Sequence, residues 1–201
     1  MKVKDIEQSF VTNTGVNIYV RPLRAADAPY LVDLFEHMGT ESRYNRFLQS
    51  TDNVGMDRIW SEAESIAYLT DGTSYGVIAF SDLPEREHAP VAAARYVLIS
   101  AQQAEIAVSV RDDMQHMGIG TELLRIVIEH ATEHGIEQLV GTVQNSNAPM
   151  WAVLKKLGHR LERYPEGSYS YIVFHINETA GRLEDWMDTA ADFSPEPQII
   201  W

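Results

Sequence analysis

Residues 106–131 read IAVSVRDDMQHMGIGTELLRIVIEHA, and this stretch decides the fold. Its first five residues alternate between apolar and smaller or polar side chains, which is the period of a half-buried strand. After a polar segment, Gly118 and Gly120 open a pattern in which apolar residues recur at helical spacing. Gly135 then stands where a left-handed glycine commonly ends a helix. The stretch predicts a strand, a glycine-containing turn and a helix.

This junction has the geometry of an anion site. A helix N-terminus that follows a strand and a glycine turn presents backbone N–H groups without partners, and these groups attract a negative charge. A side chain at Gly118 or Gly120 would keep a phosphate from approaching the backbone closely. A plain turn with a helix cap explains the same glycines, so the junction alone leaves two interpretations open.

Composition narrows the class of protein. The 201 residues suffice for one well-buried domain, and the absence of cysteine excludes disulfides and thiolate metal sites. The N-terminus has no apolar core of signal-peptide length, and no apolar run is long enough to span a bilayer, so we expect a cytoplasmic protein. The net charge of −13 argues against general nucleic-acid or anionic-membrane binding. The acidic surface either attracts a cationic substrate such as an amine or only confers solubility.

Hydrophobic periodicity predicts the other elements. Strands are expected at residues 16–20, 75–80, 91–99, 104–110, 138–143, 159–164 and 169–176. Helices are expected after a cap at Asp27, from Met56, from Gly118, and from the Asn145 segment to Gly158. Residues 41–48 form a helical turn or an ordered loop, and residues 81–90 a hairpin loop. Because helices separate only some strands, we expect an α/β (α+β) fold with a mixed, mostly antiparallel central sheet flanked by about four helices.

The domain organisation follows from the same pattern. Residues 1–176 are expected to form one domain, and residues 177–201 an acidic C-terminal extension. The extension holds a short helix near residues 183–187 or is a tail that packs on the body of the protein or on a second copy, which would make a homodimer.

A family resemblance emerges from the residues after the strand. The pattern Val108-x-Val110-x-x-x-x-Gln115-x-x-Gly118-x-Gly120 resembles the acetyl-CoA signature of the GNAT superfamily of N-acetyltransferases. The element order and a downstream Asn145-x-Asn147 block resemble that family as well, over roughly residues 16–176. A lone QxxGxG would be weak, whereas the strand before it, the helix after it and the second block make a specific combination.

The resemblance implies a set of coenzyme contacts. Backbone N–H groups would cradle the pyrophosphate of coenzyme A along Gln115, His116, Met117, Gly118, Ile119, Gly120 and Thr121. The backbone of Val108 and Val110 would pair with the pantetheine arm, and Asn147 would lie near the pantetheine or the thioester. For Asn145 and Asn147, helix capping is the alternative.

Glu105 is the candidate general base, because many GNAT enzymes place a glutamate on this strand. By strand alternation it points opposite to Ile106 and Val108 and alongside Ala107 and Ser109, whose small side chains leave room beside it. The alternative is a solvated strand glutamate. Many family members carry a tyrosine as general acid where this chain has Leu154. Nearby tyrosines at 164, 169 and 171 are interpreted as packing residues, and none is assigned as the acid.

Two further segments resemble one group of proteins within this superfamily. The residues Arg21-Pro22-Leu23-Arg24 and Glu41-Ser42-Arg43-Tyr44-Asn45-Arg46-Phe47 resemble the acetyltransferase domains of bacterial protein-lysine acetyltransferases. Arg43 and Arg46 would order this loop or contact the substrate, unless they are ordinary surface arginines. His130 and His134 lie one helical turn apart without further metal-ligand spacing, so we expect exposed histidines and no metal.

These observations give one function and its rivals. The expected function is transfer of an acetyl group from acetyl-CoA to a primary amine, on protein lysine or a small molecule, by direct attack with help from a general base. The alternative is a sensor of the same fold that binds acetyl-CoA without turnover. A third hypothesis is an α/β domain that binds no coenzyme.

Overall fold

The computed structural model describes residues 8–68, 72–180 and 187–189, and these residues divide into two compact units. The first unit takes its described residues from 1–95 and 107–127, and the second from 96–106 and 128–201. Strands β4 and β5 and helix α4 contribute residues to both units, and each unit is described by itself below. Among the described residues, no helix is long and apolar enough to cross a membrane.

The first unit is built on a sheet. Its strands follow the order β1 (Gln8–Val11), β2 (Asn17–Pro22), β3 (Ser74–Leu83), β4 (Arg86–Leu98) and β5 (Gln103–Val110). Strand β2 runs antiparallel to both β1 and β3, and Tyr19 lies opposite Phe80. Ile18 and Val20 are buried while Tyr19 between them is exposed, so the alternation in the sequence becomes the two faces of the strand.

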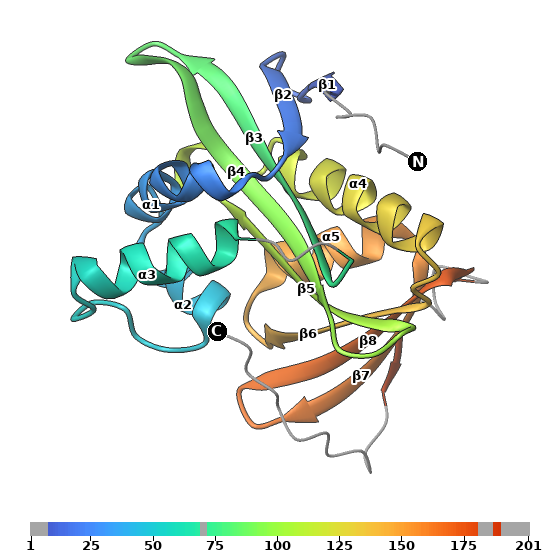
Figure 1. Cartoon of the computed structure of the whole chain (residues 1–201). Coiled ribbons are helices and arrows are strands. Elements are labelled where there is room, and N and C mark those ends of the chain that lie inside the picture. Colours follow the sequence, from blue (N-terminus) through green and yellow to red (C-terminus); the bar gives the residue numbers. More distant parts are fainter. Residues whose placement is uncertain (1–7, 69–71, 181–186, 190–201) are drawn as a thin grey trace. The chain divides into compact units, whose positions relative to one another are not determined.

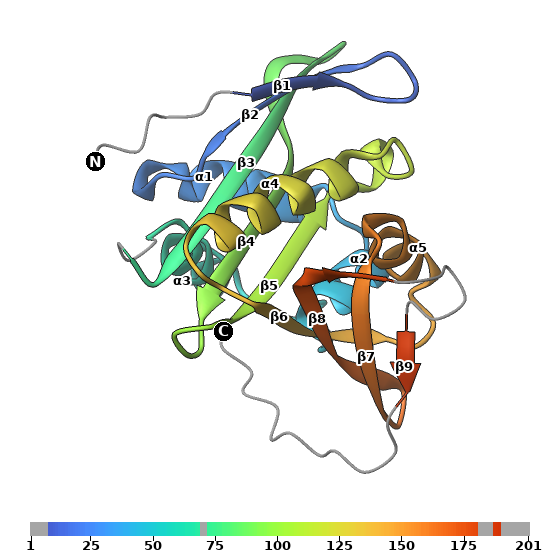
Figure 2. The same ribbon diagram turned by 90° about the vertical axis from the view of Figure 1, so that its right-hand side faces the viewer.

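Helices cover this sheet on both faces. Helices α1 (Ala28–Glu36) and α3 (Met56–Ala67) lie side by side on one face of β3 and β4, and the first turns of α4 (Ile119–Glu133) lie on the other (Figures 1 and 2). Helix α2 (Thr40–Phe47) follows α1, so the segment left open as a turn or loop is a helix. A core cluster joins α1, α3 and β3 through Leu23, Ala28, Leu31, Val32, Ala63, Ala67, Ile78 and Phe80.

Asp27 immediately precedes α1, as predicted, but its carboxylate does not cap that helix. The side chain is 3 % exposed and accepts hydrogen bonds from Arg21 at 2.7 and 2.9 Å and from the Arg24 backbone N–H at 2.8 Å. A nearly buried carboxylate requires a paired charge, and the Arg21 guanidinium at the end of β2 supplies it. Asp27 therefore joins the strand end to the helix start.

The second unit continues from β5. Its strand order is β5, β6 (Gln138–Gln144), β8 (Tyr169–Thr179), β7 (His159–Glu166) and β9 (Met187–Thr189), and Figure 2 shows β7 beside β8 and β9. Strands β5 and β6 are parallel because a helix connects them, whereas the hairpin strands β7 and β8 are antiparallel. Helix α5 (Ala148–Leu157) ends at Gly158 with φ +76°, which confirms the predicted helix end, and Gly135 after α4 has φ +78°, which confirms the predicted left-handed glycine.

One predicted loop is shorter than expected, and one predicted helix lies mostly outside the described residues. The hairpin loop predicted at residues 81–90 is reduced to Pro84 and Glu85, because β3 and β4 extend through the rest. Ser81 is 1 % exposed and donates to the Asn17 carbonyl at 2.9 Å, so it continues the strand. The predicted helix near 183–187 lies outside the described residues except for Met187, which begins β9.

Candidate functional site

The glycine turn, residues 115–121, lies in the first unit after β5 and includes the first three residues of α4. His116 has φ +61° and Gly118 has φ +90°, so two left-handed residues reverse the chain before the helix begins at Ile119. The Glu122 N–H donates to the Gly118 carbonyl at 3.1 Å as the first helical bond. The N–H groups of Gly118, Ile119, Gly120 and Thr121 therefore precede every intrahelical acceptor, which leaves a positive helix end for an anion.

The back of this turn is fastened through its carbonyls. Asn13, after β1, directs its side-chain amide to the His116 carbonyl and its backbone N–H to the Met117 carbonyl, both at 3.4 Å. Both contacts are long, and they occupy carbonyl acceptors of the turn. The Gln115 N–H donates to the Asp112 carbonyl at 3.3 Å, so the donors that remain for an anion are those at the start of α4, from Gly118 to Thr121.

Both glycines border open space. A Cβ built on Gly118 meets no atom within 4 Å, and one on Gly120 meets only the Val110 Cγ2 atom, at 3.5 Å. Core packing therefore does not explain the absence of side chains here. The φ of +90° by itself favours glycine at position 118, whereas Gly120 has no positive φ, and the open space beside it would admit a ligand that approaches the backbone.

An apolar pocket of about 60 Å³ lies in the same unit. Its walls come from helices α1, α2 and α3 and from β4 and β5, where small side chains leave room. The lining residues are Leu23, Leu31, Leu34, Phe35, Met38, Arg46, Phe47, Ile66, Ala93, Ala94, Arg95, Ala107 and Ser109. Its charged lining consists of two arginines, and its β5 wall is Ala107 and Ser109, the residues expected to share a strand face with Glu105.

The two α2 arginines have different roles. Arg43 donates to the Phe35 carbonyl at 3.1 Å and lies 4.1 Å from the centre of the Phe35 ring, so it orders the junction between α1 and α2. Arg46 lines the apolar pocket. The sequence left three roles open for these arginines: ordering of the segment, contact with the substrate, or plain exposure on the surface. Neither side chain is fully exposed in the structure.

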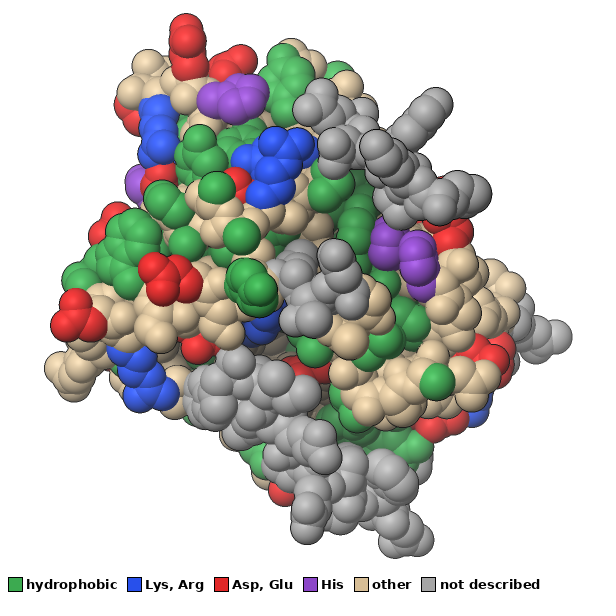
Figure 3. Space-filling view, in the orientation of Figure 1, with side chains coloured by type: hydrophobic (Ala, Val, Ile, Leu, Met, Phe, Trp, Pro, Cys, Tyr) green, Lys and Arg blue, Asp and Glu red, His purple; other side chains and the backbone are tan. Residues whose placement is uncertain are grey.

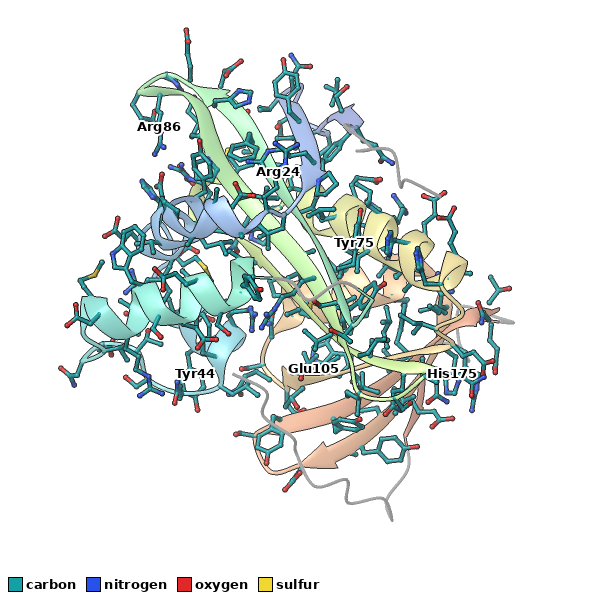
Figure 4. The ribbon with its side chains drawn as sticks, in the orientation of Figure 1. Arg24, Tyr44, Tyr75, Arg86, Glu105 and His175 are labelled. Carbon is teal, nitrogen blue, oxygen red and sulfur yellow. The ribbon has the colours of Figure 1, made fainter. Side chains whose placement is uncertain are left out.

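Glu105 belongs to the second unit, where it is half-buried on β5 opposite Val140 of β6 (Figure 4). Its charge acts on Tyr171 of β8. Burial raises the pKa of the Tyr171 phenol above its ordinary value, and the Glu105 carboxylate raises that pKa further. The sequence analysis interpreted Tyr171 as a packing residue and did not connect it with Glu105, because that relationship depends on the order of the strands and not on local spacing.

Asn147, also in the second unit, caps α5. Its Oδ1 atom accepts the Met150 N–H at 3.1 Å, which is the helix-capping interpretation. Asn145 donates to the Gly167 carbonyl at 3.0 Å and accepts from Ser170 at 2.6 Å, so it secures the β7–β8 turn. Contact of Asn147 with a coenzyme stays a prediction.

Leu154 occupies the position where many members of the resembled family carry a tyrosine as general acid, and its side chain is buried. Leu154 is 3 % exposed, so α5 offers no titratable group there. Tyr164 donates to Glu162 at 2.5 Å, and chiefly this hydrogen bond raises the Tyr164 pKa to about 12. A phenol with so high a pKa is a weak acid for a leaving thiolate.

The two α4 histidines differ, and Figure 3 shows histidine side chains grouped over this helix. His134 is exposed as predicted, but His130 is half-buried and accepts or donates a hydrogen bond with Tyr96 at 3.0 Å. Burial, and then the neighbouring His134, lower the His130 pKa to about 4. In the described part of the chain, no three His, Cys, Asp or Glu side chains gather to hold a metal ion.

Comparison with known proteins identifies a family and a relative with similar sequences. The family described as "Acetyltransferase (GNAT) domain" matches residues 17–160. A curated acetyltransferase of Pseudomonas aeruginosa, PA5475, is 25% identical over 159 residues, which are 79% of this chain and 83% of that protein.

Solved structures agree. The GNAT domain of PAT from S. lividans superposes with a TM-score of 0.71 at 25% identity, covering 84% of this chain and 96% of that one. A structure of yncA from Salmonella typhimurium with its cofactor acetyl-CoA has a TM-score of 0.60 at 17% identity, covering 83% and 98% of the two chains, and shares the fold.

Proposed function

The chain belongs to the GNAT acetyltransferase family of acetyl-CoA-dependent acyltransferases, and we propose that it acetylates a primary amine with Glu105 as general base. The observation that carries this proposal is the glycine turn. The backbone N–H groups at the start of α4 have no intrahelical acceptor. Gly118 and Gly120 border open space, which a coenzyme needs in order to approach the backbone.

The glycine turn would hold the pyrophosphate of acetyl-CoA through the N–H groups of residues 118–121. The backbone of β5 at Val108 and Val110, beyond the pairs that Gln103 to Glu105 make with β6, would pair with the amides of the pantetheine arm, like an added strand. When bound, acetyl-CoA supplies an activated acetyl thioester. The residues of this chain would fix its orientation so that the amine can attack one face of the thioester carbonyl.

The apolar pocket would receive the acceptor. Its aliphatic and aromatic walls suit the carbon stem of an amine-bearing side chain or small molecule. Ala107 and Ser109 form part of the wall, and by strand alternation Glu105 shares their face of β5. The acidic net charge of −13 favours the approach of a cationic amine.

Glu105 would take the proton that the attacking nitrogen loses, directly or through a water molecule. The new C–N bond forms as the C–S bond breaks, and the thiolate departs with the electron pair. Because Leu154 provides no acid and a thiolate is a stable leaving group, the step needs no protein acid at that place.

The second candidate is a sensor that binds acetyl-CoA without turnover, and the buried Leu154 favours it. A panel of amines distinguishes the two. Purified protein is titrated with acetyl-CoA in the presence of polyamines and lysine peptides while free thiol is measured and the products are identified by mass spectrometry. Thiol release with a matching acetylated product supports the enzyme. Tight coenzyme binding without release for any acceptor contradicts it and supports the sensor.

A further inference from the structure

Two polar side chains of the first unit join the glycine turn to helix α2, which forms part of the apolar pocket. We propose that Asp112 and Gln115 are positioning residues that transmit coenzyme occupancy of the glycine turn to α2, and so to the acceptor. This inference rests on the proposed function, because it requires a coenzyme at the turn and an acceptor in the pocket.

Asp112 holds the start of α2. Its Oδ2 atom accepts the Gly39 N–H at 2.9 Å, and its own backbone N–H donates to the His37 carbonyl at 3.2 Å. Gly39 is the N-cap residue of α2, and a Cβ there would lie 2.8 Å from Asp112 Oδ2. Only glycine lets the carboxylate come this close without a shift. These hydrogen bonds join the segment from His37 to Gly39 to Asp112, two residues after the end of β5.

Gln115 extends this tie into the glycine turn and onto α2. Its Nε2 atom lies 3.0 Å from Asp112 Oδ1, 3.1 Å from Ser42 Oγ and 3.3 Å from the Val110 carbonyl. The amide has two hydrogens for these three acceptors, so its orientation is sensitive to small displacements of the turn. A coenzyme that orders the backbone at Gln115 would select one orientation of this side chain.

Helix α2 depends on such contacts for its position. It has eight residues, and none of them is buried, so core packing contributes little to its stability. Its other contacts include those of Arg43 with Phe35, the hydrogen bond of Thr40 to Asp52 at 3.3 Å, and the packing of the Phe47 ring at 5.9 Å from that of Phe35. A short helix held by a few polar contacts opens locally at low free energy. Loss or gain of the Gln115 contact should therefore change its order measurably.

The consequence reaches the acceptor because α2 carries Arg46 and Phe47 into the pocket wall. Coenzyme binding would order this wall, and acceptor binding would in return strengthen coenzyme binding by the same factor, since thermodynamic coupling is reciprocal.

Hydrogen exchange measured by mass spectrometry tests the link on the full chain, with and without coenzyme A. The variants are Ser42→Ala, which removes one acceptor of Gln115, and Asp112→Asn, which removes a carboxylate oxygen. Matched controls are Ser61→Ala and Asp57→Asn, at exposed positions of α3. In the wild type and controls, coenzyme A should slow exchange in residues 115–122 and, by at least about fivefold, in residues 39–48.

In Ser42→Ala and Asp112→Asn the slowing should persist at residues 115–122 and be lost in α2. With an acceptor identified, both variants should weaken acceptor binding to the coenzyme-loaded protein, while the affinity for coenzyme A measured without acceptor changes less than about twofold. Protection of the turn without protection of α2 in the wild type overturns the link and leaves the proposed function standing. So does unchanged α2 protection in both variants. Absence of any coenzyme effect, with no measurable binding, contradicts the proposed function itself.

Discussion

Tyr171 on β8 lies within the electrostatic reach of Glu105 on β5: burial raises the pKa of its phenol, and the Glu105 charge raises it further. The carboxylate disfavours a second negative charge nearby, so the phenol stays protonated beside the candidate base. Glu105 is half-buried on β5 and is therefore not a fully exposed strand glutamate.

The Glu105→Gln variant should lower the pKa of Tyr171, because it removes the negative charge that opposes phenolate formation while leaving burial in place. Absorbance of the phenolate band is followed through an alkaline titration, and a Tyr171→Phe background assigns the transition. An unchanged Tyr171 pKa would show that Glu105 does not act on this phenol.

The two glycines of the turn should separate stability from affinity. Gly118→Ala should cost about 1–2 kcal/mol of stability, because its φ of +90° is unfavourable for a side chain, and should weaken coenzyme A binding. Gly120→Ala should leave stability unchanged or higher, since it lies in the first turn of α4, yet weaken binding as well. Calorimetry and urea unfolding measure the two quantities.

Gly72→Ala is the matched control, because Gly72 has φ +80° and borders open space outside the turn. It should lose stability as Gly118→Ala does and keep its coenzyme affinity. If the Gly118 and Gly120 variants bind coenzyme A as tightly as the wild type, these glycines serve only the turn.

Asn147 offers a test between capping and coenzyme contact. Asn147→Ala should reduce the free energy of unfolding by about 1 kcal/mol, because the Met150 N–H loses its acceptor, and Asn147→Asp should retain stability. Should Asn147 also contact the coenzyme through its amide, Asn147→Asp would weaken binding while remaining stable. Equal affinity in the wild type and Asn147→Asp would limit Asn147 to capping.

His130 should make the free energy of unfolding depend on pH in the acidic range. Its folded pKa of about 4 lies below the unfolded value of 6.5, so the contribution is fully present above pH 6.5 and is lost as the pH falls toward 4. Allowing for solvent screening, the loss should be about 1–2 kcal/mol. Urea unfolding of His130→Phe should show a smaller change over this range, and an identical pH dependence would contradict the assignment.

Local patterns predicted much of this fold because its decisive signals are local. Gly135 ends α4 with a positive φ, as its place after the helical pattern predicted, and Gly158 ends α5 where predicted. The hairpin at Pro84 and Glu85 was misjudged, because charged and proline residues in an exposed hairpin do not reveal where strand pairing stops.

The site was less accessible to sequence reasoning. The motif indicated the turn at Gln115, but its side-chain contact with Ser42 joins residues 73 positions apart, and nothing in the local pattern signals it. The burial of His130 likewise depends on β4, which supplies Tyr96. Spacing predicts which groups lie on one element, whereas pairing between elements requires the three-dimensional structure.

The central claim is that Glu105 makes this coenzyme-binding fold an enzyme. Its most direct test compares thiol release from acetyl-CoA by the wild type and Glu105→Gln across neutral to alkaline pH, with coenzyme A affinity measured in parallel. We predict unchanged affinity, turnover lowered by about 10²-fold or more, and loss of the base's pH dependence. Equal turnover by both proteins at every pH would contradict the assignment of Glu105 as general base.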